Sequence, residues 1–200
     1  MKKKFNQVYQ FKILLKDIRP PVWRRIQVPE TCTFWDLHVA IQDAMGWTDR
    51  HLHEFELKID PTGEMDVRIG IPDDDVIADH VVLAGWKLVI SKIFSREHNK
   101  AEYTDDFGDE WTHEILLEQI LPREKGVVYP LCIDGRRACP PEDCGGPPGY
   151  EDFLEIIMDP RNEQYHEMLD RVGGDFEPER FNAKDVFFDN PKERLKALRD

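Results

Sequence analysis

TFWDLHVAIQDAMG, residues 33–46, is the stretch of this chain that decides its fold. Thr33 is a suitable N-cap, and Asp36 three residues later gives an acidic variant of the capping box. Gly46 suits the left-handed residue that ends a helix. Apolar side chains recur at helical spacing at Phe34, Leu37, Ile41, Ala44 and Met45. The stretch therefore predicts an amphipathic helix packed across one face of a sheet.

Strands are expected on both sides of this helix. Two of them precede it and are joined by the short break at Arg19–Pro21, which favours an antiparallel pair. The segment at 86–94 is apolar on both faces, as expected of a central strand. The expected strands cover residues 10–16, 22–28, 51–59, 86–94, 102–107 and 110–119. The order predicts an α+β fold with a mostly antiparallel sheet and a β-grasp-like start, strand-strand-helix-strand.

The last third of the chain has a different character. Residues 139–149, CPPEDCGGPPG, hold too many prolines and glycines for a helix or a central strand. Helical spacing then appears at 150–158 and 160–172, and Asn190-Pro191 is typical of the start of a short terminal helix. We therefore expect a single domain over residues 1–200, in which residues 150–200 form a helical part packed on or beside the sheet.

The composition bounds the partners. The chain carries 40 acidic and 27 basic residues, a formal net charge of −13, which disfavours a broad nucleic-acid interface. A local basic patch at residues 19–25, RPPVWRR, keeps nucleic acid open as a partner, although a solvated strand edge explains it more simply. No apolar run approaches the roughly 20 residues that cross a bilayer. Met1–Phe5 is not followed by the apolar stretch of a signal peptide, and four cysteines are too few for a disulfide scaffold. We expect a cytoplasmic protein without a membrane partner.

Three histidines point to the apolar side of the expected sheet. Side chains alternate along a strand, so His51 and His53 share one face, and His113 takes the same face of its own strand. A His-x-His pair with a third histidine from a neighbouring strand can hold zinc or another divalent metal. Asp106 and Asp109, at the entrance of the last strand, are candidate oxygen ligands or general bases.

A second interpretation of these histidines is that they bond to backbone carbonyls or acids at the edge of the core. His38 joins them only if its edge of the helix faces the same way.

The proline- and glycine-rich loop is the second candidate site. Cys132, Cys139 and Cys144 lack the Cys-x2-Cys spacing of ordinary zinc ribbons, so the metal signal there is weak. Glu142 and Asp143 could instead form a rigid acidic lip, or the loop could be purely structural. The candidates for ligand binding or for this loop are Trp23, Arg24, Trp111, Cys139, Glu142 and Asp143.

Several blocks resemble, in their order, the plasmid pRiA-type open-reading-frame-three-like family, over residues 8–198. They are RPPVWRR (19–25), DLH (36–38), MGW (45–47), HLHEF (51–55), DFGDEWTH (106–113), YP (129–130), ACPPED (138–143), GG (145–146) and GY (149–150). The resemblance implies a compact α+β domain found beside mobile elements, and it implies no catalytic residues. Similar sequences often carry an apolar residue at the position of Cys144, which argues against Cys144 as an essential ligand.

Three functions are consistent with the sequence. The first is a binding or interaction module without catalysis, for an unknown protein or small-molecule ligand, favoured by the acidic charge and by the lack of a complete catalytic signature. The second is a metal-dependent, hydrolase-like enzyme that uses His51, His53 and His113. The third is a nucleic-acid accessory protein, linked to transposition or recombination, that uses residues 19–25.

Overall fold

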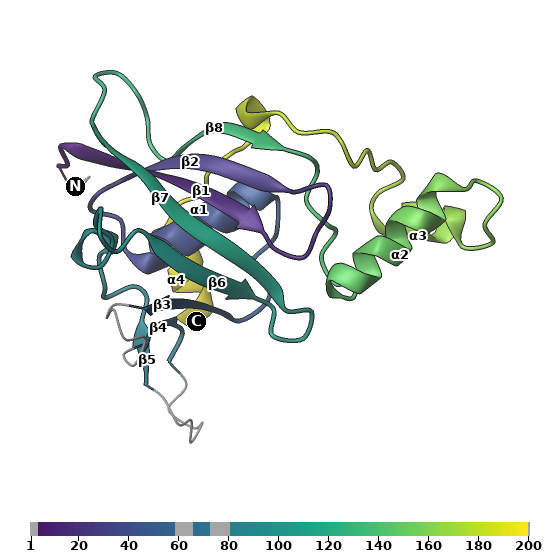
Figure 1. Cartoon of the computed structure of the whole chain (residues 1–200), viewed down its shortest axis with the longest axis horizontal. Coiled ribbons are helices and arrows are strands. Elements are labelled where there is room, and N and C mark those ends of the chain that lie inside the picture. The colour runs from purple at the N-terminus through teal and green to yellow at the C-terminus, as the bar shows by residue number, and fades with distance from the viewer. Residues whose placement is uncertain (1–3, 59–65, 73–80, 200) are drawn as a thin grey trace.

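One sheet of eight strands carries the fold in the computed structural model, which describes residues 4–58, 66–72 and 81–199 (Figure 1). The strands are β1 (Gln7–Leu15), β2 (Trp23–Pro29), β3 (His53–Lys58), β4 (Asp66–Gly70), β5 (Val82–Ala84), β6 (Lys100–Asp105), β7 (Trp111–Pro122) and β8 (Leu131–Arg136). Their order is β5-β4-β3-β6-β7-β1-β2-β8. Every neighbouring pair is antiparallel except β4 and β5. The prediction of a mostly antiparallel α+β sheet is confirmed.

The predicted helix is present as α1 (Phe34–Met45) and lies across one face of the sheet (Figure 1). The Asp36 amide donates to Thr33 Oγ1 at 3.1 Å, and the Thr33 amide donates to Asp36 Oδ2 at 2.8 Å, which completes the capping box. Gly46 ends the helix with φ +94°. The core forms between α1 and the strands, with fully buried side chains at Phe11, Ile13, Ile26, Phe34, Leu37, Ile41, Phe55, Tyr103 and Ile115.

The start of the chain has the predicted order but not a confirmed β-grasp arrangement. Strands β1 and β2 pair directly, whereas β6 and β7 separate β3 from β1 in the sheet. The long hairpin of β6 and β7 thus takes the central place. The turn between β6 and β7 reaches the end of the sheet, beside residues 51–52.

The predicted strand at 86–94 is wrong. The chain turns there and forms the short 3-10 helix η1 (Ile90–Lys92). The Ile90 amide donates to the Cys32 carbonyl and the Phe34 amide to the Leu88 carbonyl, so the segment closes the N-terminal end of α1. Ile90 and Phe94 are buried. The run is apolar because this irregular segment packs into the core. Periodicity alone does not distinguish such a segment from a buried strand. Ile59, the last residue of another predicted strand, lies outside the described residues.

The C-terminal part splits into two groups of helices. Helices α2 (Gly146–Met158) and α3 (Tyr165–Arg171) pack on each other and project from one end of the sheet (Figure 1). We call residues 146–171 the arm. Helix α2 begins inside the predicted loop, since prolines are tolerated in the first turn of a helix. After η2 (Ala183–Asp185), helix α4 (Pro191–Arg199) returns to α1 rather than to the sheet. No helix in the described part of the chain has the length and apolar character needed to cross a membrane.

Candidate functional site

Three segments meet at one end of the sheet. They are residues 46–52, which lead into β3, the turn between β6 and β7, and the loop at 139–145. The Asp106 amide donates to the Leu52 carbonyl at 3.0 Å, and the Gly145 amide donates to Asp109 Oδ2 at 3.0 Å. Gly146 has φ +68°, and a Cβ there would overlap the Asp109 carbonyl oxygen. Only glycine permits this close approach of loop and turn.

The three segments bring together His51, Asp106 and Asp143, which we call the rim cluster. His51 Nδ1 lies 3.4 Å from Asp106 Oδ2, and His51 Nε2 lies 3.1 Å from Asp143 Oδ1. One ligand atom from each residue lies within 4.8 Å of the others. Within the described part of the chain, His51 Nε2 makes no hydrogen bond of normal geometry. All three residues were candidates in the sequence. His51 and Asp106 belonged to the predicted histidine site and Asp143 to the predicted acidic loop, and the fold brings the two sites together.

The carboxylates of the rim cluster are held in different ways. Asp106 has φ +54°, and its Oδ1 accepts the amides of Gly108 at 2.9 Å and Asp109 at 3.3 Å. These bonds leave Oδ2 directed at His51. The Asp143 side chain is 64% exposed and that of His51 is 28% exposed. The turn amides therefore orient Asp106 from the protein side, while Asp143 and His51 are open to solvent.

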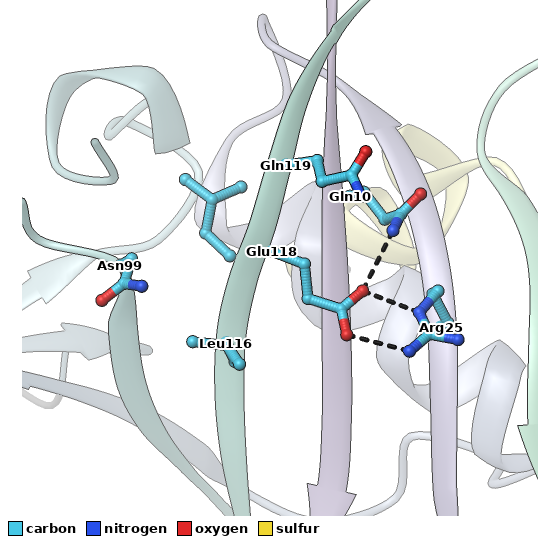
Figure 2. Close-up of a pocket in the computed structure, with 7 residues that line it drawn as sticks. Gln10, Arg25, Asn99, Leu116, Glu118 and Gln119 are labelled. Carbon is cyan, nitrogen blue, oxygen red and sulfur yellow. Dashed lines mark hydrogen bonds and ion pairs between the residues drawn. The ribbon is translucent and has the colours of Figure 1, made fainter. Parts of the chain in front are cut away.

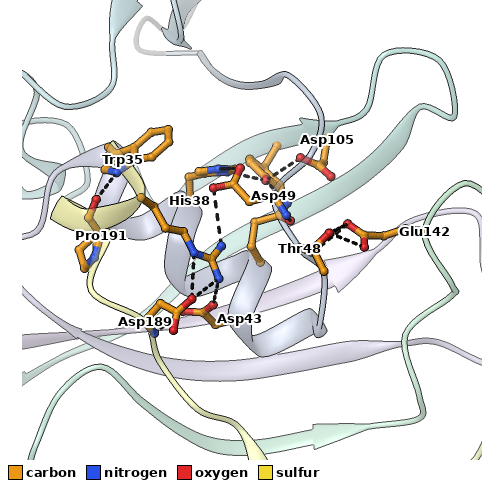
Figure 3. A network of polar contacts seen from close by, with 12 residues as sticks. Trp35, His38, Asp43, Thr48, Asp49, Asp105, Glu142, Asp189 and Pro191 are labelled. Carbon is orange, nitrogen blue, oxygen red and sulfur yellow. Dashed lines mark hydrogen bonds and ion pairs between the residues drawn. The ribbon is translucent and has the colours of Figure 1, made fainter. Parts of the chain in front are cut away.

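A second group, the buried cluster, consists of His38, Asp49 and His53. Figure 3 shows His38 and Asp49 of this cluster. His38 Nε2 lies 2.7 Å from Asp49 Oδ1, and His38 Nδ1 lies 2.8 Å from the Tyr103 hydroxyl. The His38 and His53 rings stack with centroids 3.4 Å apart and planes 8° from parallel. Burial lowers the pKa of both imidazoles, that of His53 most strongly.

The stacking argues against the buried cluster as a metal site. Imidazole lone pairs lie in the ring plane, so those of two parallel rings do not converge on one ion. Burial keeps His38 neutral, and the short contact to Asp49 is then a donation from Nε2–H. His38 Nδ1 accordingly accepts the Tyr103 proton. The buried cluster thus functions as a hydrogen-bonded network.

The Tyr103 hydroxyl is the centre of this network. Its oxygen accepts from Gln42 Nε2 at 2.9 Å, and Asp105 Oδ1 lies 3.3 Å away. Because its single proton goes to His38, Tyr103 cannot also donate to Asp105. Burial raises the pKa of Asp105 to about 7. A protonated Asp105 can donate to the Tyr103 oxygen and so complete the network.

The three predicted histidine ligands do not come together. His51 lies at the rim, and His53 is stacked on His38. His113 is fully buried, with Nδ1 3.3 Å from the Tyr103 carbonyl oxygen, and burial lowers its pKa to about 4. Among the described residues, two groups of side chains could hold a metal ion, and each contains one of the three predicted histidines. The rim cluster contains His51 and the buried cluster contains His53, and neither contains His113.

The other loop candidates support the architecture of the site. Asp109 accepts the Gly145 amide, and both oxygens of Glu142 accept from the Thr48 hydroxyl, at 3.0 and 2.7 Å. Trp111 is 2% exposed and packs 5.8 Å from the Trp47 ring. Burial raises the pKa of the Cys139 thiol to about 12, so it is not a thiolate at neutral pH.

Two of the three arginines in the basic stretch at 19–25 are engaged within the fold, while Arg19 is exposed. Arg24 is 1% exposed and donates to the carbonyls of Ala44, Trp23 and Arg136. Arg25 makes a two-bond contact with Glu118, which Gln10 also approaches (Figure 2). The Trp23 ring lies beneath the charged ends of Lys12 and Arg25. The depression that Figure 2 shows therefore has its charges already satisfied.

Sequence reasoning missed the role of Asp49 and of α4. Asp49 has φ +59° in an irregular segment, where periodicity gives no signal. Arg194 of α4 lies 3.6 Å from Asp49 Oδ2 and also binds Asp43 and Asp189 (Figure 3). A cavity of about 600 Å³ opens between α4 and residues 47–52, lined among others by Asp49, His51 and Arg194. It gives solvent a path to the His51 side of the rim cluster.

Fold and site together define a class of α+β protein in which one mostly antiparallel sheet, covered by α1, supports a histidine–carboxylate cluster at its end. The chain belongs to the plasmid pRiA4b ORF-3-like protein family, which it matches over residues 7–185. It is 36% identical over 166 residues to the uncharacterized protein y4hQ of Sinorhizobium fredii (strain NBRC 101917 / NGR234), covering 83% of this chain and 81% of that one.

A solved structure shares the fold. It is the crystal structure of a protein of unknown function, MM3350, from Methanosarcina mazei Go1, with a TM-score of 0.83 and 46% identity. The similarity covers 92% of this chain and all of that chain (100%). Family and fold are thus established, and the names of these relatives assign no activity.

Proposed function

We propose that this protein is a binding module whose ligand at the rim cluster is a divalent metal ion. The observation that carries the proposal is the meeting of His51, Asp106 and Asp143 from three separate segments, with one donor atom of each within 4.8 Å. An ion of the zinc class holds nitrogen and oxygen donors at about 2.0–2.2 Å, which places the donors about 3–4 Å apart. Asp106 Oδ2 faces Nδ1 of His51 and Asp143 Oδ1 faces Nε2, so one of the two carboxylates must move to the nitrogen that binds the ion, and the exposed Asp143 is the freer of the two.

The donor chemistry narrows the choice of metal. One imidazole and two carboxylates suit zinc or manganese, whereas thiolate ligands are absent from the cluster. Three protein ligands leave further positions for water or another molecule. Asp106 also has the support expected of a ligand, since two turn amides orient its carboxylate from behind.

Two alternatives receive less support. A hydrolase-like enzyme needs a base beside the metal, and the candidate Asp109 is engaged with the Gly145 amide. The nucleic-acid proposal relies on Arg24 and Arg25, which are occupied within the fold. We place the protein in the cytoplasm, a reducing compartment that suits the free thiols of Cys132, Cys139 and Cys144.

Calorimetric titration of untagged, metal-stripped protein with Zn²⁺ and Mn²⁺ tests the proposal. We expect one site per chain that His51→Ala removes, with His98→Ala as the matched control because His98 is exposed and lies in a distant turn. Equal binding by the wild-type protein and His51→Ala, or no binding by either, would refute the proposal.

A further inference from the structure

A second cavity lies on the other side of the acidic loop. It has a volume of about 300 Å³ and is formed by residues 141–144 together with helices α2 and α3. We call it the arm pocket. Its apolar lining comes from Phe153, Ile156, Met168 and Val172. Its volume is at the lower end of the range for small-molecule sites, which suits one extended side chain.

Carboxylates dominate the charged lining of the arm pocket. Glu142, Asp143 and Asp152 face one cation, Arg171, which is paired with Glu167 at 2.6 Å. Within the described residues, no hydrogen bond or ion pair joins the Asp152 side chain to another side chain. The partner of Glu142 is the uncharged Thr48. Asp143 contacts His51 of the rim cluster. The pocket therefore combines an apolar wall with more carboxylates than cations.

This combination selects a cation at the end of an aliphatic chain. Lysine and arginine bury their methylene stems along apolar surface and keep the charged head in a polar environment. The formal charge of −13 on the whole chain attracts basic partners and repels acidic ones. A carboxylate ligand of the same length would meet three negative groups instead.

Two exposed apolar side chains lie close to the same loop. Leu52 is 55% exposed and Phe107 is 53% exposed. Their segments are joined by the Asp106 amide and the Leu52 carbonyl, and the turn after Phe107 holds the loop through Asp109. Exposed aromatic and aliphatic side chains beside a charged pocket are typical of a protein interface. A free amine would leave both of them uncovered.

We propose that the arm pocket accepts a lysine or arginine side chain of a partner protein, while apolar neighbours of that side chain contact Leu52 and Phe107. Asp143 belongs to both the arm pocket and the rim cluster, so a metal at the rim cluster would engage one of the three carboxylates and leave Glu142 and Asp152 for the cation. It names a basic, amphipathic surface segment as the part of the partner that is recognised.

The first test uses the full chain, labelled at its methyl groups for NMR, and three probes of equal length: pentylamine, 1-pentanol and pentanoate. We expect pentylamine to bind most tightly and pentanoate least, with shifts at the methyl groups of Ile156, Met168 and Val172. Asp152→Asn should weaken amine binding about two- to fivefold, as expected for one exposed ion pair, and Asp170→Asn on α3 should not. Equal response to the three probes, or shifts confined to other surfaces, would overturn the proposal.

The second test separates a protein partner from a free amine. A short labelled peptide with one lysine among leucines is titrated by fluorescence anisotropy, beside a peptide with glutamine in place of the lysine. We expect Phe107→Ala to weaken the lysine peptide and to leave pentylamine binding unchanged, while Val128→Ala, at another exposed site, changes neither. If Phe107→Ala leaves the lysine peptide unaffected, or if both peptides bind equally, the partner-protein assignment is wrong.

Discussion

His51 Nε2 lies 3.1 Å from Asp143 Oδ1, so a residue of the segment that leads into β3 touches the loop that leads into α2. The loop also receives support from the turn between β6 and β7 through Asp109 and Gly145. The rim cluster therefore lies where the end of the sheet meets the loop that leads into the arm. A ligand bound there contacts both.

The junction depends on the absence of a side chain at Gly146. We expect Gly146→Ala to lower the free energy of unfolding by about 2 kcal/mol or more, because it adds an overlap with the Asp109 carbonyl to the cost of a positive φ. Gly126→Ala is the matched control, since Gly126 has φ +87° with open space around it. Urea denaturation measures both, and equal losses would show that the close approach is unimportant.

Acid should destabilise the fold through His113. The ordinary pKa of 6.5 applies in the unfolded chain, while the folded value is about 4. Below pH 6.5 the unfolded chain gains a proton that the folded protein takes up only near pH 4, so this stability is present above pH 6.5 and is lost as the pH falls. Between pH 7.5 and 4.5, the free energy of unfolding of His113→Leu should fall by about 2–3 kcal/mol less than that of the wild-type protein.

The control for this experiment is His98→Leu, which removes an exposed imidazole. Its unfolding free energy should depend on pH as that of the wild-type protein does. If His113→Leu behaves like His98→Leu across this range, burial of a neutral imidazole is not what makes the fold sensitive to acid.

The pKa shift of Asp105 has the opposite sign to that of His113, so its contribution to stability changes with pH in the opposite direction. Burial raises its pKa from 3.8 to about 7, so the folded protein holds a proton that the unfolded chain releases near pH 4. The associated stability is present below pH 3.8 and is lost as the pH rises through 7. Asp105→Asn should therefore be more stable than the wild-type protein at pH 8, by about 2 kcal/mol or more, and the gain should vanish near pH 4.

Asp134→Asn provides the comparison for Asp105, because the Asp134 side chain is 54% exposed and pairs only at the surface. A gain at pH 8 that is equally large in both variants, or that persists at pH 4, contradicts the role assigned to burial.

Arg194 fastens α4 to α1. Its guanidinium binds Asp43 and Asp189 and lies 3.6 Å from Asp49, and its side chain is only 20% exposed. Arg194→Met should cost about 2–3 kcal/mol, because it leaves neighbouring carboxylates without their cation. Denaturation followed by tryptophan fluorescence reports the change, since Trp35 Nε1 donates to the Pro191 carbonyl at the start of α4. Arg161→Met, with a side chain 88% exposed, should change stability by less than about 1 kcal/mol.

The sequence predicted correctly those helix ends that depend on the residues at the ends themselves. The capping box of Thr33 and Asp36, the glycine at the end of α1 and the start of α4 at Asn190-Pro191 are all present. The strand predicted at 86–94 is wrong because a buried turn with a short 3-10 helix has the same apolar pattern as a buried strand. Strand β8 was missed, since its alternation is weak at a sheet edge, where Leu131 and Ile133 remain partly exposed.

The candidate site was predicted in its parts but not in its grouping. Strand alternation correctly placed His53 and His113 on the inner face, yet it does not tell which residues become neighbours across the sheet. The contact of His51 with Asp143 depends on how the loop returns, and the loop is held by Glu142 and Gly145. Contacts of this kind arise from tertiary packing, for which a single sequence gives no periodic signal.

The most direct test of the metal site is an anomalous difference map from crystals of the full chain soaked with Mn²⁺ or Zn²⁺, recorded at and away from the metal absorption edge. We predict one strong peak bounded by His51, Asp106 and Asp143, and its loss in crystals of Asp143→Asn. A peak between His38, Asp49 and His53 instead, or no peak at the rim cluster in the soaked wild-type crystals, would contradict the account.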